Sequence, residues 1–272
     1  MDSAGVAIYN KSPPTDNEYI LRIFTRDVIG AASEVATAIA KAGGDIRSIQ
    51  LNLAGEYGFD RYIIRAKKEY LEKMVHGINS TETSRVLSIG RCMEIIKDVC
   101  TVEELDKRFK VSELSGTHGI GHVRFSTESR VDLFHAHPFQ SFSYPDIAVV
   151  HNGQITNYYK IRDKLERRGY KFETENDSEL IVHYVADKLE NGLDFEEALN
   201  ASVKDLDGPF SYIISMPDAI GVAKDKLGLR PALVLEGNEI FAIASEEVAL
   251  RALGHTGTIR NLRPGEVVTW RR

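Results

Sequence analysis

The sequence contains few cysteines and no long apolar run. Its two cysteines, Cys92 and Cys100, fit a reducing compartment. No run approaches the roughly 18 apolar residues that a membrane span requires, and residues 1–15 lack the charged start and apolar stretch of a signal peptide. We therefore expect a cytoplasmic protein that has no membrane interaction.

The charge balance argues against nucleic-acid and anionic-membrane partners. The net charge is -6, and acidic and basic residues are interspersed. The one dense basic stretch, 162–168, also contains acidic and apolar residues. Nucleic acids and anionic membranes attract continuous basic surfaces. With 43% hydrophobic and 27% charged residues, the chain has the composition of a globular protein with one large core or two domains.

The cysteines and histidines also lack the spacing that is typical of metal sites. Cys92 and Cys100 do not form a paired motif. His118 and His122 are four residues apart, but HGIGH contains two glycines where a helix would be needed to place both rings on one face. GTHGIGH is not followed by the lysine of a phosphate-binding loop. We expect no metal site and no cofactor.

Residues 17–90 have the pattern of a compact α+β unit. Strand-like and helix-like segments alternate in the order β-α-β-β-α-β, which is the ferredoxin-like order. The stretch 25–51, TRDVIGAASEVATAIAKAGGDIRSIQL, also resembles the opening of an ACT domain, a small fold that often binds amino acids or pairs subunits. Short patterns of this kind often match by chance. We interpret 17–90 as a structural insertion without a ligand.

The rest of the chain has a different texture. Residues 91–111 are predicted to form a helical connector, and short strands separated by Gly, Pro and Asn turns follow from Leu114. Two amphipathic helices are predicted, TNYYKIRDKLERRG ending at Gly169 and DSELIVHYVADKLENG ending at Gly192. We therefore look for candidate catalytic and binding residues in the intervening loops.

The first polar loop is 117–129, THGIGHVRFSTES. The guanidinium of Arg124 matches a carboxylate with two hydrogen bonds, and Ser126 or Thr127 could add a third. An arginine on a strand is more often a surface residue or part of a structural ion pair.

Two further loops carry alternatives of the same kind. Asn152 and Gly153 are typical of a type I′ hairpin turn, which is the favoured interpretation, but an Asn amide and a Gly N–H can also stabilise an oxyanion. Asp177 either caps the helix that follows or receives an ammonium group. Together with Arg124, these residues would hold an amino acid that carries a reactive side-chain amide, and glutamine fits that description.

These loops, in this order, resemble the class II glutamine amidotransferase domain of the N-terminal-nucleophile hydrolases. The matching segments include DSAGVAIYN, GHVRFSTES, HNGQITNYYKIRDKL and ENDSELIVH. They lie in residues 1–16 and 114–272, and the stand-alone glutaminase subunits of glutamate synthase and N-methylglutamate synthase are the most similar. The resemblance implies an α+β fold, a four-layer α-β-β-α sandwich, with residues 1–16 and 91–272 in this domain and 17–90 as a ferredoxin-like/ACT-like insertion.

The resemblance also implies site residues. Arg124 would bind the α-carboxylate of glutamine with help from Thr127. Asp177 and the backbone near Gly153 would bind the α-ammonium. Asn152 and the Gly153 N–H would form the oxyanion hole.

The nucleophile of the family is an N-terminal cysteine, and it precedes the segment that Met1 opens here. Neither Cys92 nor Cys100 has the free α-amine that this mechanism requires. Either an internal methionine was taken as the start, or the chain is a relic that binds glutamine without cleaving it. We favour the first account, because the missing segment would supply a central strand.

The implied activity is the hydrolysis of glutamine to glutamate, with ammonia passed to an acceptor. The chain ends at Arg272 without an acceptor domain, so we expect that domain on a separate, flavin-dependent synthase subunit in an oligomer. The alternative is a non-catalytic amino-acid-binding regulatory or structural subunit. Whether the chain is an enzyme depends on a cysteine encoded upstream.

Overall fold

The protein was analysed as a computed structural model, which describes residues 2–11, 14–125, 132–238 and 240–272. The chain forms two compact units, Met1–Ile147 and Ala148–Arg272. Both contain helices and strands, as predicted for an α+β protein. We describe each unit by itself. Within the described residues, no helix is both long and apolar enough to cross a membrane.

The first sheet of unit 1 has its earliest strand in the centre. β1 (Asp2–Asn10) pairs antiparallel with β7 (Met93–Asp98) and with β8 (Gly116–Phe125). Helix α3 (Val102–Phe109) packs against this sheet, and the short η2 (Val111–Glu113) follows it. Buried apolar residues at this contact are Ala4, Ile96, Cys100 and Leu105.

The prediction of a helical connector over 91–111 is wrong for its first part. Met93–Asp98 form strand β7, and the α-helix α3 begins only at Val102. The pattern misled because two polar residues of β7 are buried. Glu94 accepts hydrogen bonds from Arg22 and Arg61, at 2.8 and 2.9 Å, and Lys97 donates to the carbonyl oxygens of residues 136 and 138. A buried strand with distant polar partners shows no simple alternation.

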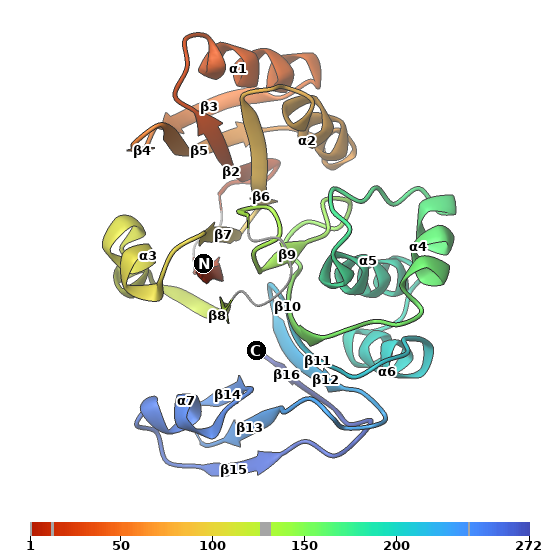
Figure 1. Ribbon diagram of the computed structural model, residues 1–272. Coiled ribbons are helices and arrows are strands. Elements are labelled where there is room, and N and C mark those ends of the chain that lie inside the picture. Colours follow the sequence, from red (N-terminus) through yellow and green to blue (C-terminus); the bar gives the residue numbers. More distant parts are fainter. Residues whose placement is uncertain (1, 12–13, 126–131, 239) are drawn as a thin grey trace. The chain divides into compact units, whose positions relative to one another are not determined.

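The second sheet of unit 1 is formed by 18–90. Its strand order is β3-β5-β2-β6, with β2 (Glu18–Arg26), β3 (Asp45–Gln50), β5 (Tyr57–Arg65) and β6 (Ser84–Gly90). The short β4 (Leu53–Ala54) pairs with β5. Helices α1 (Ala31–Lys41) and α2 (Leu71–Asn79), the latter preceded by η1 (Lys68–Tyr70), lie beside each other (Figure 1). Apart from β4, the elements follow the predicted β-α-β-β-α-β order. The insertion boundaries and the ACT-like role stay predictions.

The described residues of unit 2 form a larger sheet, a smaller sheet and four helices. The larger sheet contains β10 (Ala148–Gly153), β11 (Phe210–Met216), β12 (Ala219–Lys224) and β16 (Val267–Arg271) as antiparallel neighbours. Helices α4 (Tyr158–Arg167) and α5 (Asp177–Glu190) confirm the two predicted helices. The smaller sheet contains β13 (Leu233–Glu236), β14 (Phe241–Ala244) and β15 (Thr258–Asn261), next to α7 (Glu247–Ala252).

Helix α6 (Phe195–Asp205) was not predicted, although its start is visible in the sequence. Asp194 accepts a hydrogen bond from the Glu197 N–H, and Glu197 accepts one from the Asp194 N–H, at 2.8 and 2.9 Å. This reciprocal pair is a capping box, whose signature is a short acceptor followed three residues later by Glu. Helix α6 packs against β12 and β16, and α5 packs against β10.

We predict that Glu94→Gln lowers the free energy of unfolding by about 3 kcal/mol, because Arg22 and Arg61 would lose their shared carboxylate in a mostly buried place. Urea unfolding followed by circular dichroism measures the change. Asp16→Asn is the control, since the pair of Asp16 with Arg91 is exposed and should contribute little. If Glu94→Gln lowered the free energy of unfolding no more than Asp16→Asn does, the prediction that the buried pairs of Glu94 stabilise the fold would be contradicted.

Candidate active site

Asn152 and Gly153 form the end of strand β10, where they lie opposite Ser211 and Phe210 of β11. The favoured interpretation of this pair as a hairpin turn is therefore wrong. Gly153 has φ 138°, and an added Cβ would lie 2.7 Å from the Cα of Phe210. Glycine is required here because two strands approach closely at a positive φ.

The N–H of Gly153 points away from β11. Both backbone groups of Phe210 are hydrogen-bonded to Asp225. The Phe210 N–H donates to the Asp225 carboxylate at 3.0 Å, and the Asp225 N–H donates to the Phe210 carbonyl oxygen at 2.9 Å. Gly153 and Phe210 therefore face each other as a pair without mutual hydrogen bonds, in which the backbone groups point outward. The register therefore leaves the Gly153 N–H without a hydrogen bond to β11.

Asp177 opens helix α5 but is not its cap. The side chain of Asn176 caps the helix by accepting the Ser178 N–H at 2.9 Å. Asp177 instead reaches the segment after β10, where its Oδ2 accepts the Ile155 N–H at 3.0 Å. Its side chain is 25% exposed and can therefore meet a ligand. Unit 2 thus brings three predicted site residues into one neighbourhood: Asn152, Gly153 and Asp177.

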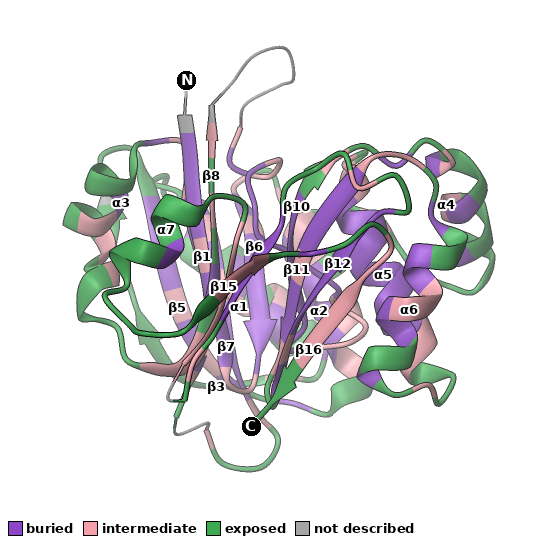
Figure 2. Cartoon of the chain, turned by 90° about the horizontal axis from the view of Figure 1, so that it is seen from below, coloured by how far each residue is buried: buried purple, intermediate pink, exposed green. Residues whose placement is uncertain are grey.

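A buried histidine that the sequence analysis missed joins these residues. His151 precedes Asn152 in β10, and its Nδ1 lies 3.1 Å from Ser178 Oγ and 3.4 Å from Asp177 Oδ1. Its Nε2 has no hydrogen-bond partner in the described part of the chain. The available signal was its position directly before the Asn-Gly pair. Figure 2 shows that most of β10 and α5 is buried.

Arg124 lies in unit 1, near the end of β8 and opposite Ser3 of β1. Arg124 is partly buried and has an interaction partner. Most of the loop predicted for 117–129 is strand β8, and the predicted Thr127 lies outside the described residues. A joint glutamine site of Arg124 with the residues of unit 2 stays a prediction.

Comparison with known proteins identifies the family. Residues 123–252 match the model of a glutamine amidotransferase domain. A protein of Methanothermobacter thermautotrophicus that is named as a glutamine amidotransferase is 48% identical over 271 residues, 98% of this chain and 88% of the relative. The chain belongs to the glutamine amidotransferase family.

Other relatives are more distant. The glutamine amidotransferase-like protein GlxB of Rhizobium meliloti is 37% identical over 61% of this chain and 54% of its own length. The glutamine phosphoribosylpyrophosphate amidotransferase of B. subtilis has a TM-score of 0.56 at 21% identity, over 93% of this chain and 47% of that one. The chain therefore spans about half the length of these two proteins. The structural likeness shows that this chain shares the fold of the B. subtilis protein.

The charge state of Asp177 suits an ammonium ligand. Burial favours the neutral carboxyl group, but the hydrogen bonds and charge of His151 and the Ile155 N–H outweigh it. The pKa of Asp177 is therefore below its ordinary value, and the group is a carboxylate at neutral pH.

The two cysteines of the chain are unsuited to act as nucleophiles. Burial and the charge of Asp146 raise the pKa of Cys92 to about 12, and burial and Asp98 raise the pKa of Cys100 to about 11. A thiol is nucleophilic only as the thiolate. Both thiols are therefore protonated and unreactive at pH 7.

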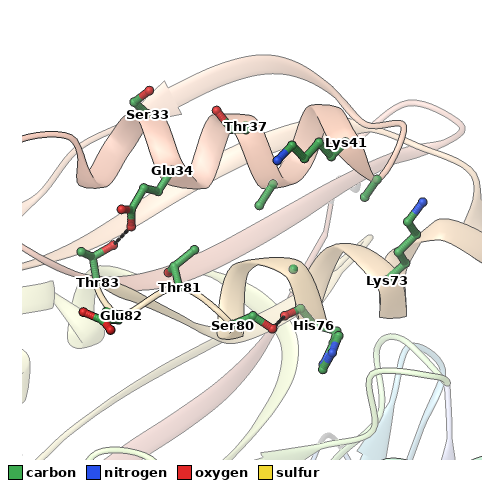
Figure 3. Close-up of a pocket in the computed structure, with 13 residues that line it drawn as sticks. Ser33, Glu34, Thr37, Lys41, Lys73, His76, Ser80, Thr81, Glu82 and Thr83 are labelled. Atoms are coloured by element: carbon green, nitrogen blue, oxygen red, sulfur yellow. Dashed lines mark hydrogen bonds between the residues drawn. The ribbon is translucent and has the colours of Figure 1, made fainter.

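A separate groove of 730 Å³ lies between helices α1 and α2 in unit 1. Figure 3 shows Lys41 from α1 with Lys73 and His76 from α2 along this groove, and Glu34 bonded to Thr83. Its lining residues all fall within 33–83, whereas the predicted site residues begin at Arg124. The groove is therefore not part of the proposed glutamine site.

We predict that neither thiol of the folded protein reacts quickly with Ellman's reagent at pH 7. Raised pKa values leave a thiolate fraction roughly 100-fold or more below that of free cysteine. The absorbance of the released thionitrobenzoate gives the rate. Protein unfolded in urea is the control and should release two equivalents rapidly, and fast reaction of the folded chain would contradict the pKa shifts.

Proposed function

We propose that the protein is the glutamine-hydrolysing component of a glutamate-synthase-type assembly. It would release ammonia from the side-chain amide of glutamine and pass it to an acceptor on a separate, flavin-dependent subunit. The observation that carries the glutamine part is that Asp177 accepts the Ile155 N–H, two residues after the Asn152-Gly153 pair at the end of β10, in a member of this family. The partner subunit and an oligomeric assembly rest on the resemblance to stand-alone glutaminase subunits.

Each part of glutamine has a complementary group in this proposal. The carboxylate of Asp177 pairs with the α-ammonium, and Arg124 with Thr127 pairs with the α-carboxylate. The Asn152 amide and the Gly153 N–H donate to the side-chain carbonyl oxygen. Their position at the end of a paired strand supports this role, because donors on a rigid element need no reorganisation when charge develops.

A nucleophile is required to form the acyl intermediate and release ammonia, and the protonated thiols of Cys92 and Cys100 do not supply it. Binding and hydrolysis are therefore tested separately. Glutamine binding without hydrolysis by the native protein would favour the alternative of a regulatory, amino-acid-binding subunit.

We predict that Asp177→Asn weakens glutamine binding at least ~10-fold, because a hydrogen-bonded ion pair becomes a neutral contact of the same shape. Isothermal titration calorimetry measures the dissociation constant. Asp187→Asn is the matched control, since Asp187 is a buried aspartate of the same helix that pairs with Arg168. Loss of glutamine binding in both variants, or in neither, would contradict the proposal that Asp177 binds the α-ammonium group.

We further predict that Asn152→Ala lowers the rate of glutamine hydrolysis on the order of 100-fold while the dissociation constant of glutamine changes little. An oxyanion donor acts mainly on the transition state. The experiment uses protein isolated from its own cell, with glutamate release as the assay. Parallel losses in binding and rate would point to ground-state contact instead.

A further inference from the structure

A buried carboxylate holds the segment that leads into Asp177. Glu179 lies in the first turn of α5 and is 2% exposed. Its Oε1 accepts the N–H of Glu173 at 2.7 Å. Its Oε2 accepts both the N–H and the hydroxyl of Thr174, at 2.8 and 2.6 Å. One side chain thus folds back from the helix and fixes two consecutive residues of the preceding loop.

The hydroxyl of Thr174 passes this constraint to the neighbours of Asp177. It donates to Glu179 and accepts the Asn176 N–H at 3.1 Å. The side chain of Asn176 in turn accepts the Ser178 N–H at 2.9 Å. The residues on both sides of Asp177 are therefore tied, directly or through one hydroxyl, to Glu179.

A cation clamps the same loop from helix α4. Arg162 donates from Nη1 to the Thr174 carbonyl oxygen at 3.1 Å and stacks over the Phe172 ring at 4.5 Å. It also donates to the Tyr158 hydroxyl at 2.6 Å. Both the N–H and the C=O of Thr174 are thus hydrogen-bonded, which restrains the backbone of the loop before Asp177.

We infer that Glu179, acting through Thr174, is a positioning residue for Asp177 that makes the site selective for ligands with an α-ammonium group. The inference rests on the proposed glutamine site. An ammonium must approach one carboxylate oxygen closely to form a charge-assisted hydrogen bond, and its strength falls steeply with misalignment. A small rotation of the 174–178 segment would move Asp177 without removing it.

The negative charge at Glu179 is required for this geometry. A glutamine at this position keeps the volume but presents one oxygen and one NH₂ group. The NH₂ would face an N–H donor of Glu173 or Thr174, so at least one of the three hydrogen bonds is lost. His183 Nε2 also lies near this carboxylate, 3.6 Å from Glu179 Oε1.

The test compares two ligands in calorimetry, glutamine and glutaramate, which is glutamine without its α-amino group. Glu179→Gln is expected to weaken glutamine binding about 10-fold, whereas the dissociation constant of glutaramate changes less than about twofold. The ratio of the glutaramate dissociation constant to the glutamine dissociation constant therefore falls. Thr174→Val is expected to act in the same direction, and Thr174→Ser, which keeps the hydroxyl, is expected to restore the ratio. Asp187→Asn is the control and should leave the ratio unchanged.

The outcomes separate this inference from the function on which it rests. Wild-type protein that binds no glutamine would overturn the proposed function. Wild-type binding with an unchanged ratio in Glu179→Gln and Thr174→Val would overturn the positioning role alone. Equal weakening of both ligands would also overturn it, because a merely structural residue does not distinguish them. If Glu179→Gln fails to fold, the two Thr174 variants decide.

Discussion

Buried carboxylates that accept backbone N–H groups hold the turns of both units. In unit 1, Asp146 accepts the N–H groups of Arg91, Cys92 and Met93 at 2.8–2.9 Å, and its own carbonyl oxygen accepts the Tyr9 hydroxyl. These bonds fix the turn between β6 and β7. Leaving such buried donors unpaired would cost about 1–3 kcal/mol each, so the turn depends on one aspartate.

The same interaction shapes the candidate site in unit 2. Asp225 holds both backbone groups of Phe210, the residue opposite Gly153, while Asp177 holds the Ile155 N–H. The groups proposed to stabilise an oxyanion and to bind an ammonium are thus fixed by side chain to backbone bonds on a paired strand and a helix. Donors fixed before the reaction lose little entropy and need little reorganisation.

The residue types of the site could be predicted from the sequence, but their setting could not. Asn152 and Gly153 have a strong local turn preference, and the approach of Phe210, which is remote in the sequence, places them in a strand instead. Asn176 and Asp177 are both short acceptors, and only the position of the Ile155 N–H distinguishes cap from site. Most helices and strands followed from periodicity, whereas the pattern of β7 depends on distant charge partners.

The ionisation of the site and the stability of unit 2 have a common origin. Burial raises the pKa values of Asp177 and Glu179, yet nearby histidines and backbone donors lower them below the ordinary values. The backbone donors are in place only in the folded chain. A pKa depressed by folding contributes stability above its unfolded value, and that stability is lost as pH falls through the folded value. Because the same protonation removes the proposed charge partner of an ammonium ligand, we expect acid to weaken both folding and the proposed ligand binding.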